Sequence, residues 1–244
     1  MTSQNPVIKT TDMKKTFFTA LVALCTATML SACGQKQDEN AENLNQNPQN
    51  ELKEVAGRQN FGSKGIITPL PALMIATYDA EGTPDVMMAA WGGQCGANQI
   101  CFELSAHKTT DNIRLKKAFC ISFASVEDVA QSDYFGIVSG NDVPDKVARA
   151  GFTATPSPNV DAPIINEYPV TLECRVVELT EYEGGGARVV GEIVNMSADP
   201  AVLDAEGRVD LGKLKPVVFD SSANLYRVVG DSVGTAWGSG KRFE

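Results

Sequence analysis

Residues 170–176 alternate strictly between apolar and polar side chains. Valine, leucine, cysteine and valine occupy positions 170, 172, 174 and 176, and threonine, glutamate and arginine lie between them. Successive side chains of a β-strand point to opposite faces, so this period of two predicts a strand with one face in a core. A turn sequence with three glycines follows at 181–186, and an apolar run returns at 187–196. Together these segments predict a long antiparallel hairpin.

Short apolar runs separated by turn residues recur through the rest of the chain. Runs at 73–78 and 86–91 flank a turn at 79–84 and predict a second hairpin. The remaining strand-like runs are 100–104, 119–123, 217–219 and 225–229. Helical signals are fewer, and they predict short helices at 109–117, with N-cap residues within 109–112, at 125–134 and at 143–150. This pattern predicts a mainly β fold with short helices, built as an antiparallel barrel.

A different pattern marks the N-terminal part of the chain. Two lysines follow Met13, an apolar stretch covers 17–30, and the sequence Leu-Ser-Ala-Cys ends at Cys33. This arrangement resembles a bacterial lipobox, in which the cysteine is lipidated and becomes the mature N-terminus. We therefore expect Met13 as the initiator, residues 1–32 as a signal peptide and a lipid on Cys33. The alternative is a simple membrane anchor, but the apolar stretch is shorter than the roughly 20 residues that a span needs.

Residues 33–57 are rich in Asn, Gln and Glu and have almost no apolar side chains. Such a composition cannot offset the entropy of ordering, so we expect a disordered tether between the lipid and one folded domain at 58–244. The expected location is the cell envelope, on its periplasmic or surface face. Gly34, in place of the aspartate associated with retention in the inner membrane, favours the outer membrane.

Charge and cysteine content narrow the function classes. The chain has a formal charge of −9, which argues against nucleic acid and against contact with an anionic membrane beyond the lipid anchor. There is one histidine and no Cys-x-x-Cys, so we expect no zinc site. An oxidising compartment permits disulfides among Cys95, Cys101, Cys120 and Cys174, but the last three lie in apolar runs and are expected to be buried free thiols.

Residues 105–113 form the best candidate site. The segment leaves a predicted strand, presents hydroxyl groups and a lysine, and opens a helix. Free N–H groups at a helix start, together with hydroxyls and a cation, can hold a phosphate. The alternative is an ordinary helix cap with an exposed lysine.

Five motifs in order resemble one family. They are D-x-x-G-x-x-x-V-M-M-A-A-W at 79–91, S-x-x-x-T-x-x-N-I at 105–113, S-G-N-D-V-P-D-K at 139–146, D-A-P at 161–163 followed by L-E-C at 172–174, and G-E-I at 191–193. This series resembles the flavin reductase-like, FMN-binding split-barrel family, which includes flavoredoxins, over residues 69–226.

The resemblance implies a Greek-key split β-barrel that forms a homodimer and holds FMN near the subunit interface. It also implies a set of cofactor-binding residues. Backbone groups of Met87, Met88, Ala89, Ala90 and Trp91 would meet the flavin ring, Ser105, Lys108, Thr109 and Thr110 would hold the phosphate or ribityl chain, Asn112 would brace that loop, and Ser139, Gly140 and Lys146 would close the site. His107 stands where relatives carry an arginine-like residue, and a neutral imidazole makes a weaker phosphate clamp.

The expected function is therefore that of an envelope flavoprotein oxidoreductase. It would transfer hydride or electrons through FMN to an unknown acceptor. A nicotinamide donor or a redox partner protein would supply those electrons. The alternative is a non-catalytic lipoprotein module that binds flavin or another ligand. Simpler interpretations of single residues stay open: Met87, Met88 and Trp91 as core residues, Lys146 as a solvated helix lysine, and Trp237 as a cover of the flavin or a frayed tail residue.

Overall fold

The computed structural model describes residues 53–62, 65 and 67–244. The predicted signal peptide, the lipidation site at Cys33 and most of the predicted tether lie outside the described residues. The chain divides into two units at residues 65 and 66. Described residues of the first unit are exposed and contain neither helix nor strand, and the second unit holds every element that follows.

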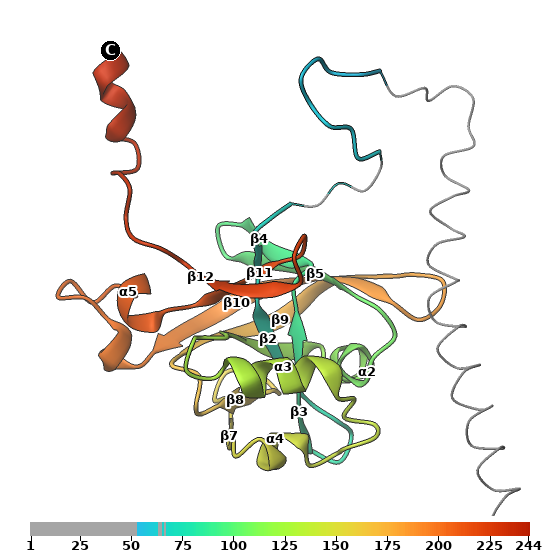
Figure 1. Cartoon of the computed structure of the whole chain (residues 1–244). Coiled ribbons are helices and arrows are strands. Elements are labelled where there is room, and N and C mark those ends of the chain that lie inside the picture. Colours follow the sequence, from blue (N-terminus) through green and yellow to red (C-terminus); the bar gives the residue numbers. More distant parts are fainter. Residues whose placement is uncertain (1–52, 63–64, 66) are drawn as a thin grey trace, which may run out of the picture. The chain divides into compact units, whose positions relative to one another are not determined.

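A seven-stranded antiparallel sheet forms the body of the second unit (Figure 1). Its strands run in the order β3-β2-β6-β9-β10-β5-β4, so β3 and β4 are its two edges. Their bounds are β2 Leu73–Tyr78, β3 Pro84–Ala89, β4 Gly92–Gly96, β5 Gln99–Leu104, β6 Ala118–Phe123, β9 Val170–Glu181 and β10 Ala187–Ala198. Both predicted hairpins, β2–β3 and β9–β10, are confirmed.

Smaller elements surround this sheet. A three-stranded sheet has the order β1 (Leu70–Pro71), β11 (Val217–Asp220) and β12 (Leu225–Val228). A two-stranded sheet pairs β7 (Ala154–Pro156) with β8 (Pro163–Ile165). The helical elements are α2 (Lys108–Lys116), α3 (Val129–Ile137), α4 (Lys146–Arg149), η1 (Pro200–Val202), α5 (Leu211–Leu214) and η2 (Ser239–Phe243). No helix among the described residues is long and apolar enough to cross a membrane.

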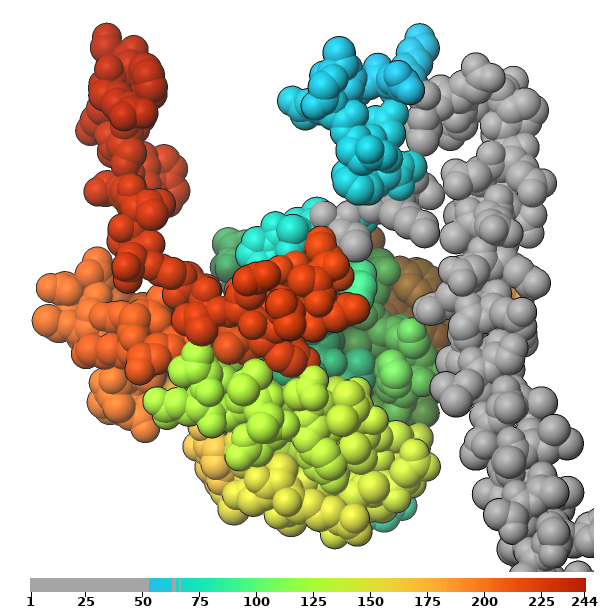
Figure 2. Space-filling view, in the orientation of Figure 1, coloured from blue at the N-terminus to red at the C-terminus, as the bar shows by residue number. Residues whose placement is uncertain are grey.

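Strand β2 is buried on both faces, because alternate side chains enter two different core clusters. Leu73 and Ile75 join the inner cluster, which also contains Phe102 and Phe119. Met74 and Ala76 join the outer cluster, whose other members include Phe135, Phe152 and Tyr168. Helix α3 and the segment that follows it cover this outer side (Figure 2). A strand with two apolar faces is typical of the centre of a fold.

Gly191 is fixed by the close approach of an aromatic ring. A Cβ at this position would lie 2.4 Å from Cζ of Phe119. The β9–β10 ladder also shifts its register between Val190 and Gly191. The glycine of the G-E-I motif is therefore explained by packing, since any side chain would displace the buried Phe119 ring.

Several predicted boundaries were wrong. Helix α2 begins at Lys108, and its N-cap is His107, without a side-chain capping bond, rather than a residue within 109–112. Helix α3 begins at Val129 instead of 125, because the Asp128 carboxylate accepts hydrogen bonds from the amide and hydroxyl of Ser125 and holds a turn there. Helix α4 covers only 146–149 of the predicted 143–150. Strand β4 was missed because its glycine-rich sequence has low β-propensity.

Candidate functional site

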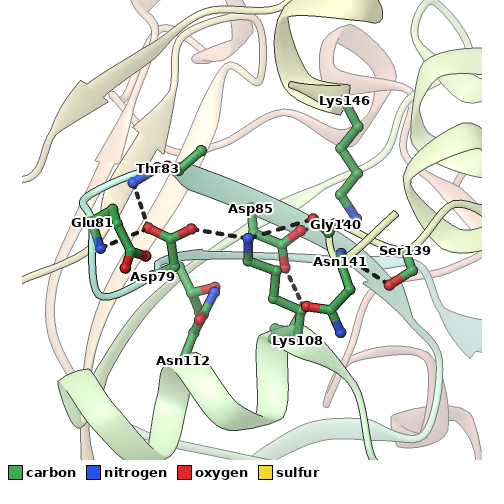
Figure 3. Close-up of polar contacts among 12 residues, drawn as sticks. Asp79, Glu81, Thr83, Asp85, Lys108, Asn112, Ser139, Gly140, Asn141 and Lys146 are labelled. Carbon is green, nitrogen blue, oxygen red and sulfur yellow. Dashed lines mark hydrogen bonds and ion pairs between the residues drawn. The ribbon is translucent and has the colours of Figure 1, made fainter. Parts of the chain in front are cut away.

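Five of the predicted site residues lie around a polar cluster between the β2–β3 hairpin, α2 and the segment that leads into α4, namely Lys108, Asn112, Ser139, Gly140 and Lys146 (Figure 3). Asp79 Oδ1 accepts backbone hydrogen bonds from Thr83 at 2.7 Å and Glu81 at 3.1 Å. Its Oδ2 lies 2.9 Å from Lys108 Nζ. Burial acts to raise the pKa of Asp79, but the bonds from Lys108 and from the two amides outweigh it and hold the pKa below its usual value. The charge of Lys108 is therefore already balanced within the protein.

Asp85 and Lys146 form a second, deeper ion pair. Lys146 Nζ lies 3.0 Å from Asp85 Oδ1, and both side chains are 3% exposed. The ammonium also donates to the carbonyl of Val138 at 2.9 Å, and Thr109 Oγ1 donates to Asp85 Oδ2 at 2.8 Å. These contacts join β3, the start of α2 and the start of α4 through buried polar atoms.

Gly140 lies against both ion pairs. A Cβ at this position would stand 2.3 Å from Asp85 Oδ1 and 3.0 Å from Lys108 Cδ. The Gly140 carbonyl also accepts a 3.4 Å bond from Lys108 Nζ. The glycine of the S-G motif is thus required for the loop to approach the two charged pairs.

The start of α2 has backbone donors available to an anion. Ser105, Ala106 and His107 are exposed, and no side chain accepts from the first turn of this helix. Thr110 Oγ1 donates to the Ser105 carbonyl at 2.7 Å and fixes the preceding loop. Free N–H groups and the positive end of the helix dipole favour a phosphate at such a position.

Strand β3 offers a second feature, an unpaired backbone edge. It pairs only with β2 in the sheet, so the N–H and C=O groups of its other side have no partner strand. Ala89 and Ala90 are small, and the Trp91 side chain beyond them is 64% exposed. The core interpretation is therefore wrong for Trp91. Met87 and Met88 are partly buried and pack against the inner and outer clusters respectively.

The remaining predicted residues take different positions. Ser139 is exposed, and its hydroxyl accepts from the Asn141 amide at 3.1 Å. Asn112 is buried and donates to Thr77 Oγ1 on β2 at 3.0 Å. Lys146 is buried, so the interpretation as a solvated lysine is wrong. The Trp237 side chain is 97% exposed.

The sequence motifs did not predict a role for Asp79 or Asp85, the two aspartates that pair with the lysines. Asp79 stood inside the D-x-x-G motif, and Asp85 opens an otherwise apolar run. A carboxylate at the start of an apolar strand is the signal that could have identified Asp85, because such a group needs a buried cation or several donors. Contacts that span 24 and 61 residues, from Asp85 to Thr109 and Lys146, are set by the tertiary fold.

The donor set fits a flavin mononucleotide in part. The helix start, the Ser105 hydroxyl and the free edge of β3 suit a phosphate and a ring with hydrogen-bonding edges. Lys108, Lys146, Thr109 and Asn112 already have protein partners, so the positive charge that faces a phosphate is limited. Among the described residues, no group of three or more His, Cys, Asp or Glu side chains could hold a metal ion.

Comparisons with known proteins identify the family of this chain. The family model of the flavin reductase like domain matches residues 67–220, more than half of the chain. Flavoredoxin of Desulfovibrio vulgaris (Miyazaki F) is 32% identical, and the match covers 78% of this chain and 100% of that chain with a TM-score of 0.68. Flavoredoxin from Methanosarcina acetivorans is 27% identical over 78% of this chain and 100% of that chain, with a TM-score of 0.70.

A third comparison concerns the fold. The FMN-binding domain of a flavin reductases-like enzyme from Shewanella baltica is 17% identical, covers 68% of this chain and 89% of its own, and has a TM-score of 0.57. The solved structures that are similar to this chain include a split-barrel domain, so the predicted split barrel is confirmed. The chain belongs to the flavin reductase-like domain family.

Proposed function

We propose that this chain is a lipid-anchored flavoprotein of the cell envelope that binds FMN and transfers hydride or electrons through it to an acceptor. The observation that carries the proposal is the pairing of two features: an α2 start without a side-chain cap and a β3 edge without a partner strand. Helix α2 packs against β3, and the bond from Thr109 to Asp85 links them. One ligand with an anionic end and a flat polar ring would use both features.

The anionic end would lie at the start of α2. The donors there are the first backbone amides of the helix, the Ser105 hydroxyl and the His107 imidazole. Lys108 would add a cation that is shared with Asp79. In this proposal Thr110 holds the loop by its bond to the Ser105 carbonyl rather than by touching the ligand.

The ring would lie along β3. Its backbone at residues 87–89 would supply hydrogen bonds to the polar edge, since the carbonyls of Ala90 and Trp91 already accept from Gly92 and Glu103. The alanines at 89 and 90 would let the ring approach closely. Trp91 would cover the exposed part of the ring. Asp85, Lys146, Gly140 and Asn112 would act as positioning residues, since their contacts hold β3, α2 and the loop at 139–142 together.

Bound FMN would supply the hydride and electron transfer, and the protein would bind and orient it. None of the described residues around this site needs to serve as a general acid or base in this proposal. A nicotinamide or a redox protein of the envelope would donate the electrons, and the acceptor would be a further partner. The proposal includes a homodimer because the family resemblance implies one.

The test compares the affinity of the full chain for FMN and for riboflavin, which lacks the phosphate. We expect FMN to bind more tightly, because hydrogen bonds to a charged group contribute about 1.5–3 kcal/mol, roughly tenfold or more in Kd. His107→Glu should remove this preference for FMN by placing a negative charge at the helix start. Ser222→Glu, on an exposed turn outside the site, is the matched control.

The outcomes separate the possibilities. Equal affinities for FMN and riboflavin would overturn the phosphate position, and a chain that binds neither flavin would overturn the cofactor. A bound flavin that accepts electrons under illumination but passes them to no quinone, nitro compound or redox protein would favour the non-catalytic module over the oxidoreductase.

The envelope location has its own test. Cells expressing the full chain are grown with a radioactive fatty acid, and the label on the protein is measured. We expect label on the wild type and on Cys25→Ser, and none on Cys33→Ser, since the lipobox cysteine is the acceptor in this proposal. Label that persists in Cys33→Ser would exclude this anchor.

A further inference from the structure

We propose that Cys95 and Cys101, on the β4–β5 hairpin, form a dithiol site that undergoes thiol–disulfide exchange and closes into a disulfide. The site lies outside the residues assigned to the flavin, so it can fail or hold independently of the proposed function. Its partner class is a small-molecule or protein disulfide.

The hairpin places both cysteines close together. Strands β4 and β5 pair Gly93 with Cys101 and Gly96 with Gln99, and the ladder shifts its register between Gln94 and Gly96. Cys95 is the extra residue of this bulge, so its backbone is released from the regular pairing. Cys95 follows Gly93, the partner of Cys101, by two residues, and the two thiols lie close enough for Cys101 to raise the pKa of Cys95.

The pair faces solvent, in contrast to the other two described thiols. On β5, the side chains of Ile100, Phe102 and Leu104 enter the inner cluster. Those of Cys101 and Glu103 therefore point to the opposite face of the strand, away from this cluster. Cys95 is exposed and Cys101 is half-buried, whereas Cys120 and Cys174 are buried. The expectation that Cys101 would be fully buried, as the other two are, was therefore wrong.

Access to Cys101 is open as well. Its cross-strand neighbour is Gly93, where an added Cβ would meet nothing within 4 Å. A glycine opposite a cysteine leaves room for an attacking or departing thiolate.

Charged groups frame the pair on the same face. Arg188 and Val190 on β10 lie opposite Glu103 and Cys101, and Glu103 accepts a 3.0 Å bond from the Tyr182 hydroxyl. Partial burial and the neighbouring Cys101 thiol raise the pKa of Cys95, and the Arg188 guanidinium acts in the opposite direction. Burial raises the pKa of Cys174 to about 12, and that of Cys120 also rises, so these two thiols are poor competitors for an oxidant.

The exchange balances with oxidised glutathione as the oxidant. The Cys95 thiolate attacks one glutathione sulfur, breaks the glutathione disulfide and releases one glutathione thiolate. The Cys101 thiolate then attacks Cys95 Sγ, breaks the mixed disulfide and releases the second glutathione thiolate. Two electrons pass from the cysteine pair to glutathione, and the two thiol protons end on the released thiolates.

The experiment incubates the full chain with oxidised glutathione and maps the cysteine-containing peptides by mass. We expect the loss of two free thiols, a single peptide containing both Cys95 and Cys101 that is lighter by two hydrogen atoms, and full reversal by reduced glutathione. Cys101→Ser should trap a glutathione adduct on Cys95 that the wild type does not accumulate. Cys174→Ala, which removes a buried thiol, is the control and should behave as the wild type.

Three results would overturn the proposal. They are a stable glutathione adduct on Cys95 of the wild type, a disulfide between the Cys95 residues of two chains, and both thiols remaining free. Far-UV circular dichroism of the same samples shows that each variant is folded, so a failure of exchange cannot be assigned to unfolding.

Discussion

Lys146 Nζ lies 3.0 Å from Asp85 Oδ1, and both side chains are almost completely removed from solvent. The pair joins the start of β3 to the start of α4. Two charges at such depth are tolerated because each compensates the other, and because Thr109 donates to Asp85 and Lys146 donates to the Val138 carbonyl. The pair therefore couples the stability of the domain to the position of the 138–146 segment.

Removing one member of this pair should be costly. We expect Lys146→Met to lower the free energy of unfolding by about 3–5 kcal/mol, because it leaves the Asp85 carboxylate buried without a cation. Lys116→Met is the matched control, since Lys116 pairs with the exposed Asp161, and it should cost about 0–1 kcal/mol. Denaturant unfolding measures both. A Lys146→Met variant as stable as the control would show that the pair is not a buried structural element.

Gly140 should tolerate no side chain. Gly140→Ala places a Cβ against Asp85 and Lys108, and we expect a loss of about 1–3 kcal/mol from overpacking. It should also weaken FMN binding, since the loop would move away from the two ion pairs. Gly230→Ala, where an added Cβ meets nothing within 4 Å, is the control. Thermal unfolding and an FMN titration of the two variants give the answer, and equal melting temperatures would contradict the steric argument.

Glu173 should make stability depend on pH. The buried carboxylate accepts hydrogen bonds from Ser157, Asn159 and Asn195. Burial acts to raise the pKa of Glu173, but the three donors outweigh it and lower the pKa. The folded state therefore binds fewer protons than the unfolded state, and this stabilisation is lost as pH falls from about 4.3 through the lower folded value.

Glu173→Gln checks this pH dependence. We expect the variant to be less stable at neutral pH by about 2 kcal/mol and to lose less stability on acidification, because the charge-assisted bonds are already gone. Glu183→Gln, in the exposed turn of the β9–β10 hairpin, should follow the wild-type curve. Urea unfolding at several pH values measures the curves. Parallel curves for wild type and Glu173→Gln would refute the assignment.

The two tryptophans allow the flavin to be located. The chain has only Trp91 and Trp237, so Trp237→Phe retains the emission of Trp91 alone and Trp91→Phe that of Trp237 alone. We expect FMN to quench the first variant strongly and the second weakly, because Trp91 follows the free edge of β3. A fluorescence titration decides. The reverse pattern would indicate that the C-terminal segment covers the flavin.

The sequence by itself determined the fold class, the two hairpins and the family. The period of two at 170–176 and the turn at 79–84 are local signals, and they correctly predicted the β9–β10 and β2–β3 pairs. Glycines at 140 and 191 appeared in motifs, but the sequence did not say which atoms they approach. Only neighbours distant in the chain, Asp85 and the Phe119 ring, exclude a side chain there.

Tertiary structure alone decided how the charged residues are used. Lys108 and Lys146 appeared from the sequence as cations available to a ligand, but the fold brings Asp79 and Asp85 against them, because a buried ammonium group requires a partner. Helix starts were also misplaced, since capping depends on which turn the surrounding contacts stabilise. Local periodicity depends on residues that are adjacent in the sequence. The pairing of charges and the close approaches of glycine depend on segments that meet only in the folded chain.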